Sequence, residues 1–241
     1  MSTNSKLSVG EVHVWQVHLV AQKEGIRTCR KLLSADEIER ADRFHFERDR
    51  ERFIIARAAM RSILSQYLRL APEQVAFSYG PRGKPELSPR QAQSDIKFNL
   101  SHSSEFALLA VAKGPHLGVD LEFVNREFAT EEIANRFFSA REAALLCSLP
   151  PPARTEAFFN CWTRKEAYIK ALGEGMTVPL NSFDVAFAPG VPAALLHVSV
   201  DPAEVTRWSM YDINAATGYK AALVVEGRGH QLRQLQWESE P

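Results

Sequence analysis

Two S-A-x-E tetrapeptides, Ser34-Ala35-Asp36-Glu37 and Ser139-Ala140-Arg141-Glu142, lie 105 residues apart in the chain. Each is a capping box, in which a serine and the glutamate three residues later satisfy each other's free backbone amides at a helix start. Two further pairs of similar segments follow the boxes in the same order, 51–53 with 156–158 and 75–77 with 185–187. This order predicts a duplicated helix-then-strand unit with a five-residue insertion in the later copy, chance similarity being the alternative.

The hydrophobic periodicity around these segments predicts both helices and strands. Apolar residues at three- and four-residue steps predict long helices over 51–70 and 153–172. Period-two alternation and short apolar runs predict strands at 11–20, 75–79, 96–100, 106–112, 117–124, 195–200, 207–212, 219–225 and 232–237. We therefore expect an α+β fold of two pseudo-symmetric α/β halves, residues 1–115 and 116–241, with the active site at their seam.

The composition excludes several classes of protein. The 241 residues are 45% hydrophobic and 24% charged, which is typical of a globular chain and not of a disordered or fibrous one. The 29 basic and 29 acidic residues cancel, so no overall field attracts nucleic acid or an anionic membrane. The three cysteines lack a C-x-x-C spacing, which favours a reducing compartment. With no apolar signal segment visible, we expect a cytoplasmic protein.

A first candidate site is the segment Gly118-Val119-Asp120-Leu121-Glu122. On a strand, Asp120 and Glu122 share one face, while the residues between them face the other way. Two carboxylates this close raise each other's pKa unless a cation lies between them, and Mg²⁺ prefers such oxygen ligands. The alternative is a solvated polar face on an edge strand.

A second candidate lies within the helix predicted over 153–172. Glu166 and Lys170 stand together on one border of its apolar stripe, where they could reach a site. The alternative is an ordinary surface ion pair between residues four apart. Lys165 falls inside the stripe, and we expect its side chain to reach solvent by snorkelling.

A third candidate is the strand end Phe98-Asn99-Leu100-Ser101-His102-Ser103. Its hydroxyls and imidazole form a donor-rich turn of the kind that holds phosphate oxygens. A nucleophilic Ser101 is disfavoured because the sequence has no G-x-S-x-G elbow. A structural histidine remains the alternative for His102.

These three segments, F-N-L-S-H-S at 98–103, G-V-D-L-E at 118–122 and W-T-R-K-E-A-Y-I-K at 162–170, resemble in type, order and spacing the signature motifs of the 4'-phosphopantetheinyl transferases. The chain length, the duplication and R-G-K-P at 82–85 resemble the surfactin-synthetase-activating type of this family. The resemblance covers about residues 34–184. It implies Mg²⁺-dependent transfer of the 4'-phosphopantetheine of coenzyme A to a serine of an acyl-, peptidyl- or aryl-carrier protein, giving holo carrier and adenosine 3',5'-bisphosphate.

The resemblance also implies roles for individual residues. It makes Asp120, Glu122 and Glu166 the Mg²⁺ ligands, with Glu166 or a metal-bound water as the base that takes the serine proton. Lys170 would contact the coenzyme A phosphates and assist the leaving group. Further contacts to the coenzyme A phosphates are implied for Arg40, Lys84, Ser101 and His102.

Two other residues qualify this picture. Arg57 interrupts the apolar stripe of the helix over 51–70, where an inward guanidinium needs an anion, and we expect a coenzyme A phosphate to supply it. Glu37 stands where some members of the family carry a lysine, so the 3'-phosphate would be held by fewer positive charges.

The resemblance leaves two other functions as alternatives. A catalytically inactive module that binds coenzyme A or carrier proteins is disfavoured because all the acidic motif residues are present. A transferase for another nucleotide is disfavoured by the absence of G-x-x-x-x-G-K-[ST]. We expect a free-standing monomer in fatty-acid, nonribosomal-peptide or siderophore biosynthesis, with no nucleic-acid or membrane partner. Candidate contacts to an acidic carrier protein are Arg141, Arg154 and Arg164.

Overall fold

The computed structural model describes residues 7–80, 83–173 and 178–238, and the chain folds into two compact units. The first unit comprises the residues up to Leu100, Glu105–Gly114 and the residues from Gln231 onward, and the second comprises Ser101–Ser104 and Pro115–His230. Helices and strands are mixed throughout, which confirms the α+β class. The division of roles between 1–115 and 116–241, and a site at their seam, stay predictions.

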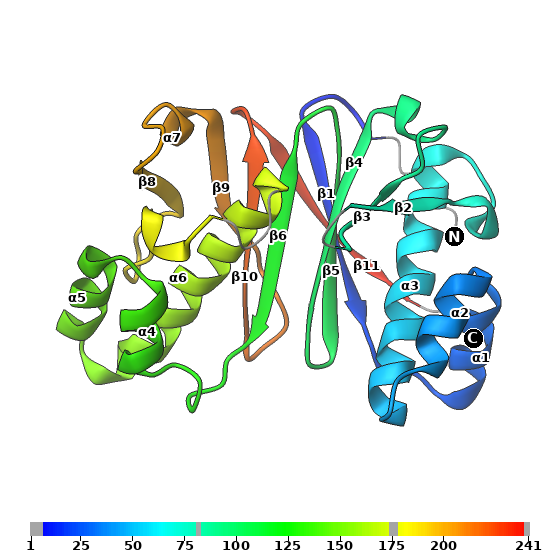
Figure 1. Ribbon diagram of the computed structural model, residues 1–241, viewed down its shortest axis with the longest axis horizontal. Coiled ribbons are helices and arrows are strands. Elements are labelled where there is room, and N and C mark those ends of the chain that lie inside the picture. The colour runs from blue at the N-terminus through cyan, green and yellow to red at the C-terminus, as the bar shows by residue number, and fades with distance from the viewer. Residues whose placement is uncertain (1–6, 81–82, 174–177, 239–241) are drawn as a thin grey trace. The chain divides into compact units, whose positions relative to one another are not determined.

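The first unit is built around a sheet of four strands with helices packed beside it (Figure 1). β1 pairs in parallel with β11 and antiparallel with β5, and the sheet order is β11 (Gln231–Trp237), β1 (Glu11–His18), β5 (Phe106–Lys113) and β4 (Ile96–Ser103). Its helices and its small hairpin are α1 (Lys23–Lys31), α2 (Ala35–Asp42), α3 (Glu47–Leu68), β2 (Phe77–Tyr79) and β3 (Pro85–Leu87). The buried face of α3 and the inward side chains of β1 and β5 form one apolar core.

The second unit has a three-stranded sheet that the long helix α6 (Pro151–Leu172) crosses. The sheet order is β6 (Leu117–Phe123), β10 (Tyr219–Glu226) and β9 (Trp208–Asp212), all antiparallel. The remaining elements are α4 (Glu131–Phe137), α5 (Ala140–Ser148), α6 (Pro151–Leu172), β7 (Phe183–Ala186), β8 (Ala194–Val198) and α7 (Glu204–Arg207). A second apolar core joins α6 to the β9 and β10 strands and to the β7–β8 pair.

Both units follow the same order of elements. In each, a strand is followed by three helices, a short strand pair and two strands that return to the sheet, giving β1-β5-β4 in one and β6-β10-β9 in the other, although the second unit has the short helix α7 before its last two strands. At both predicted capping boxes the glutamate accepts from the serine amide, Ser34 to Glu37 and Ser139 to Glu142, and in the second box the Ser139 hydroxyl also accepts from the Glu142 amide. The third helix of each unit, α3 or α6, has 22 residues. This repetition supports the predicted duplication, which itself stays a prediction.

The long helices begin slightly before their predicted starts, at Glu47 and at Pro151. Proline suits the first turn of a helix, since the amide it lacks would have no partner there. The sequence did not lead us to expect α1 and α4, which are short and mostly polar. None of the helices in the described ranges combines the length and apolar character that a membrane crossing requires.

Candidate functional site

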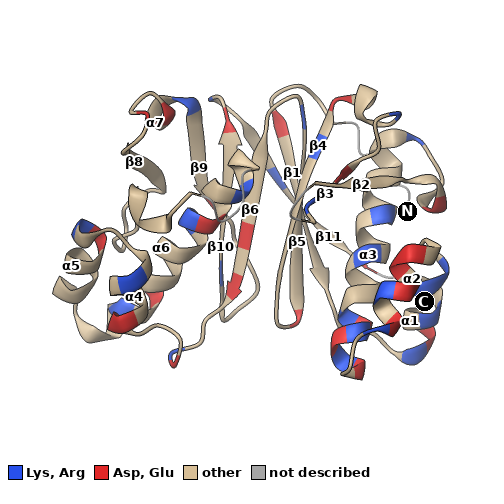
Figure 2. Ribbon diagram, in the orientation of Figure 1, with Lys and Arg blue, Asp and Glu red and all other residues tan. Residues whose placement is uncertain are grey.

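The carboxylates of β6 lie on the face of the sheet that α6 covers. Asp120 is only 2% exposed, and Glu122, two residues on, is half-buried. Figure 2 shows acidic segments on β6 beside the basic and acidic segments of α6. The burial of Asp120 rules out the alternative of a solvated strand face, although β6 is an edge strand of its sheet.

Gly118 allows α6 to approach β6 at backbone contact. A Cβ atom at Gly118 would lie 2.2 Å from the carbonyl oxygen of Ala167 and 2.3 Å from the backbone nitrogen of Ala171. No side chain fits at such distances, so only glycine permits this packing. The close contact brings the last turns of α6, with Glu166 and Lys170, onto the carboxylates of β6.

Lys170 and Ser101 both contact one oxygen of Asp120. The Lys170 ammonium lies 2.6 Å from Asp120 Oδ1 and 2.9 Å from Ser101 Oγ, and the Ser101 hydroxyl donates to the same Oδ1 at 3.0 Å. The other oxygen, Oδ2, is buried and has no hydrogen-bond partner among the described residues. A buried carboxylate oxygen without a donor is available to bind a cation.

The three acidic side chains share an electrostatic environment. Burial, followed by repulsion from Asp120, raises the pKa of Glu122 to about 7. Burial and then Asp120 also raise the pKa of Glu166 above its ordinary value, and the Lys170 charge opposes both shifts. Because the ionised forms of Glu122 and Glu166 are disfavoured, a divalent cation bound between the carboxylates would offset this cost.

The donor set fits Mg²⁺ by its chemistry, since carboxylate oxygens are the ligands this ion prefers and Asp120 Oδ2 has no competing donor. As placed, however, no three histidine, cysteine, aspartate or glutamate side chains within the described ranges come close enough together to hold a metal ion. The metal-binding roles of Asp120, Glu122 and Glu166 therefore stay a proposal.

In the first unit, Arg57 has an anion from within the chain. Glu37 is 1% exposed, and its carboxylate lies 2.9 Å from Arg57 Nε and 2.6 Å from Arg61 Nε. Arg57 also donates to the hydroxyl of Tyr79. The prediction that Arg57 points inward and needs an anion is confirmed, but the anion is Glu37, so no phosphate is required. Glu37 itself is buried, so its side chain does not face a ligand as the lysine of some family members was expected to do.

The other residues predicted to contact coenzyme A are placed as follows. Arg40 is exposed on α2, with its guanidinium 5.3 Å from the centre of the Phe53 ring. Lys84 is half-buried just before β3, and His102 is exposed near the end of β4. Arg82, the first residue of the R-G-K-P segment, lies outside the described residues. Arg40, Arg57 and Lys84 belong to the first unit, whereas the remaining predicted site residues belong to the second.

Lys165 does not snorkel, contrary to the prediction. Its side chain is fully buried and forms a 2.7 Å ion pair with Glu142, the glutamate of the second capping box. Its ammonium also donates to the carbonyl oxygens of Leu180 and Phe183. Snorkelling fails because this part of α6 is covered by α5 and β7 and offers the ammonium no path to solvent.

The arginines predicted to receive a carrier protein differ in their surroundings. Arg164 is 2% exposed and makes a two-pronged ion pair with Asp212, so it presents no charge outward. Arg154 donates to the carbonyl oxygens of Cys147 and Leu149, which gives it a structural role. Of these three side chains, that of Arg141 is mostly exposed.

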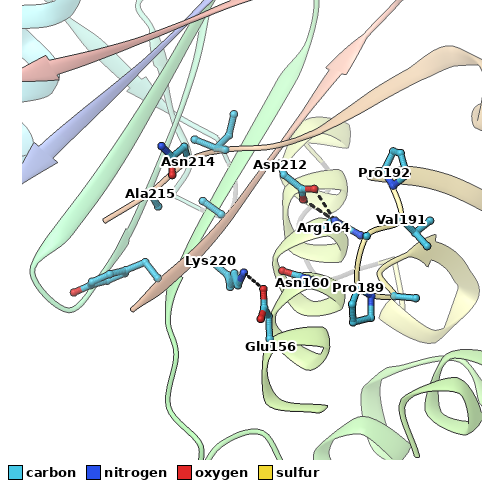
Figure 3. Close-up of a pocket in the computed structure, with 15 residues that line it drawn as sticks. Glu156, Asn160, Arg164, Pro189, Val191, Pro192, Asp212, Asn214, Ala215 and Lys220 are labelled. Atoms are coloured by element: carbon cyan, nitrogen blue, oxygen red, sulfur yellow. Dashed lines mark hydrogen bonds and ion pairs between the residues drawn. The ribbon is translucent and has the colours of Figure 1, made fainter. Parts of the chain in front are cut away.

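A pocket of about 480 Å³, lined in part by Arg164, opens on the second unit (Figure 3). The ion pairs Arg164–Asp212 and Glu156–Lys220 stand in its wall, so its charged groups compensate each other. The sequence did not lead us to expect this pocket. It also gave no role to Gly118, and it indicated Ser103 only as one hydroxyl of a phosphate-holding turn, not as a hydrogen-bond partner of Glu122.

Two family models together match most of the chain. Residues 116–224 match the 4'-phosphopantetheinyl transferase superfamily, and residues 20–114 match the 4'-phosphopantetheinyl transferase N-terminal family. The chain is 41% identical over 228 residues to the 4'-phosphopantetheinyl transferase HetI of Nostoc sp. (strain PCC 7120 / SAG 25.82 / UTEX 2576), covering 95% of this chain and 93% of that one. It is 32% identical over 166 residues to the 4'-phosphopantetheinyl transferase Sfp of Bacillus subtilis (strain 168), covering 69% and 71%.

The holo-[acyl-carrier-protein] synthase of Thermotoga maritima superposes on 47% of the chain and 64% of its own length. The TM-score is 0.38 at 23% identity, which is too low to support a conclusion about function.

Proposed function

Because the chain belongs to the 4'-phosphopantetheinyl transferase superfamily, we propose that it transfers the 4'-phosphopantetheine arm of coenzyme A to a serine of an apo carrier protein. The serine oxygen forms a bond to the β-phosphorus of coenzyme A, and adenosine 3',5'-bisphosphate leaves. The observation that carries the proposal is the contact of α6 with β6, which brings Lys170 onto Asp120 within the motifs of this family.

Asp120, Glu122 and Glu166 are the proposed Mg²⁺ ligands. When bound, the ion would neutralise charge on the pyrophosphate and on the departing bisphosphate. Two observations support this role: Asp120 Oδ2 has no hydrogen-bond partner in the part of the chain that the structure describes, and the pKa values of the two glutamates are raised.

Glu166 is the proposed base for the serine proton. Burial and Asp120 raise its pKa, which makes its carboxylate a better proton acceptor than an exposed glutamate. A water molecule at the site is the alternative acceptor. Lys170 supplies positive charge beside Ser101 and Asp120, where it can stabilise the charge that develops on the leaving phosphate.

The proposed contacts to coenzyme A are Arg40, Lys84, Ser101, His102 and Lys170. They supply cationic and hydroxyl donors of the kind that hold phosphate groups. For Arg57, whose charge Glu37 already compensates, the contact stays a prediction without structural support. If Arg57→Ala leaves the Michaelis constant for coenzyme A unchanged, the proposed contact between Arg57 and coenzyme A must be dropped.

The proposed partners are acyl-, peptidyl- and aryl-carrier proteins, and the proposed state is a monomer in the cytoplasm. The three cysteines are all free, which supports a reducing compartment. Size-exclusion chromatography tests the monomer, since a trimer would indicate a different type of transferase.

Intact-mass analysis of an apo carrier protein tests the function directly. With coenzyme A and Mg²⁺, we expect the carrier to gain the mass of one phosphopantetheine arm. The gain should disappear in EDTA and with Glu122→Ala, while Glu156→Ala, an exposed glutamate on α6, should leave it intact. Coenzyme A binding without any mass gain on several carriers would indicate an inactive binding module.

A further inference from the structure

Two serines at the end of β4 make the same contact with β6. Ser101 and Ser103 are two residues apart, as are Asp120 and Glu122, so each serine stands opposite one carboxylate. Ser101 Oγ donates to Asp120 Oδ1 at 3.0 Å, and Ser103 Oγ donates to Glu122 Oε2 at 2.9 Å.

Each serine is also held by the backbone of β6. The amide of Leu121 donates to Ser101 Oγ at 3.3 Å, and the amide of Phe123 donates to Ser103 Oγ at 3.0 Å. An amide can only donate, so the serine oxygen accepts there and the hydroxyl proton is left for the carboxylate. The hydroxyl therefore fixes each carboxylate relative to the strand that carries it.

The two serines differ in what else they contact. Ser101 Oγ also accepts from Lys170, and it is one of the proposed coenzyme A contacts. The hydrogen bonds of Ser103 Oγ within the described part of the chain go to Glu122 and to the Phe123 amide. Asp120 is additionally held by Lys170, whereas Glu122 has a longer side chain with one more rotatable bond to restrain.

We propose that Ser103 is a positioning residue that holds the Glu122 carboxylate ready to bind a divalent cation. The inference rests on the proposed function only in taking Glu122 as a cation ligand. One oxygen of the carboxylate accepts from Ser103, and the other accepts no hydrogen bond from residues 7–80, 83–173 or 178–238, so it can bind the ion. Partners that orient a metal ligand in this way typically change metal affinity about 10- to 100-fold.

The test measures Mn²⁺ binding to the full-length protein by electron paramagnetic resonance, with no substrate present. We expect Ser103→Ala to weaken Mn²⁺ binding about 10- to 100-fold and Ser103→Thr, which keeps the hydroxyl, to bind within about threefold of wild type. The matched control is Ser209→Ala, which removes a buried hydroxyl in the same unit that donates to the carbonyl oxygen of Gly227. This control should bind Mn²⁺ as wild type does.

A second readout separates positioning from a general structural effect. For Ser103→Ala, the Mg²⁺ concentration that gives half-maximal carrier modification should rise, and the rate at saturating Mg²⁺ should recover toward wild type. If Ser103→Ala does not fold, Ser103→Cys, which has a similar size and only a weak donor, takes its place and should show the same direction of change.

Three results would overturn the inference: wild-type Mn²⁺ affinity in Ser103→Ala, equal weakening in Ser209→Ala, or no Mn²⁺ binding by the wild-type protein. Failure of the proposed function looks different. In that case the wild-type protein modifies no carrier, while its Mn²⁺ affinity still depends on Ser103.

Discussion

Lys165 of α6 and Glu142 of α5 form a 2.7 Å ion pair in which the lysine side chain is fully buried and the glutamate side chain is 2% exposed. Glu142 also accepts from the backbone amides of Ser139 and Val185. The same arrangement exists in the first unit, where Glu37 binds Arg61 and Arg61 donates to the carbonyl oxygens of Pro72 and Val75. Each capping-box glutamate thus ties a short helix to a long one.

Removing the lysine of this pair should destabilise the fold. Lys165→Met leaves the buried Glu142 carboxylate without its counter-charge and two carbonyl oxygens without the ammonium that donates to them, so we expect the free energy of unfolding to fall by about 3–5 kcal/mol. Urea denaturation measures the change. The control Arg141→Met alters a mostly exposed side chain 3.8 Å from Asp184 and should cost less than about 0.5 kcal/mol. If Lys165→Met lowered the free energy of unfolding by as little as Arg141→Met does, the stabilising role of the Lys165–Glu142 pair would be contradicted.

Gly118→Ala should impair both stability and transfer. The new methyl group would meet the backbone of α6 rather than a movable side chain, so the helix must shift away from β6. We expect a loss of about 1–3 kcal/mol, with a fall in transfer rate because Lys170 and Glu166 move with the helix. Thermal unfolding and the carrier assay check both effects. Gly80→Ala, where the nearest atom is 3.9 Å away, is the control, and matching behaviour of the two variants would refute the close contact.

Lys170→Met should reduce the rate of transfer much more than it reduces coenzyme A binding. We propose that the ammonium, which lies beside Ser101 and Asp120, stabilises the charge that develops on the leaving phosphate, and losing such a group typically costs about 100- to 1000-fold in rate. Single-turnover kinetics with saturating coenzyme A measure the step. Lys220→Met, which removes a partly exposed lysine paired with Glu156, should stay near wild type. A rate within twofold of wild type in Lys170→Met would exclude the assigned role.

Glu122→Gln should separate stability from activity. The ionised carboxylate is disfavoured by burial and by Asp120, so its neutral replacement should raise the melting temperature of the metal-free protein. Transfer should fall by about 100-fold or more because a proposed metal ligand is lost. Melting curves in EDTA and in Mg²⁺ test this, and Mg²⁺ should stabilise the wild-type protein but not the variant. Equal stabilisation of both by Mg²⁺ would remove Glu122 from the ligand set.

Local patterns predicted the acidic site better than they predicted its surroundings. Period-two alternation correctly placed Asp120 and Glu122 on one face, because that rule depends only on the strand itself. It could not show that α6 covers this face at Gly118, since that contact joins segments about fifty residues apart.

For the buried charged residues, too, the sequence predicted the direction of the side chain but not its partner. The stripe of α3 correctly indicated an inward Arg57, yet its anion lies 20 residues earlier in a different helix. The partner of Lys165, Glu142, also belongs to another helix. The sequence pattern of α6 alone could not reveal this partner, so we expected Lys165 to snorkel. Helical periodicity gives the direction of a side chain but does not identify what it meets, and that depends on tertiary packing.

The parallel pairing of β1 with β11 has a consequence for synthesis of the chain. β11 begins more than 200 residues after β1 ends, and all of β6 to β10 is made between them. At a synthesis rate of roughly 5–20 residues per second, about 10–40 s pass between the synthesis of β1 and that of β11, the strand that pairs with the second edge of β1. During that interval the nascent chain exposes unpaired backbone groups that other strands can bind, which makes this edge a target for chaperones and for aggregation.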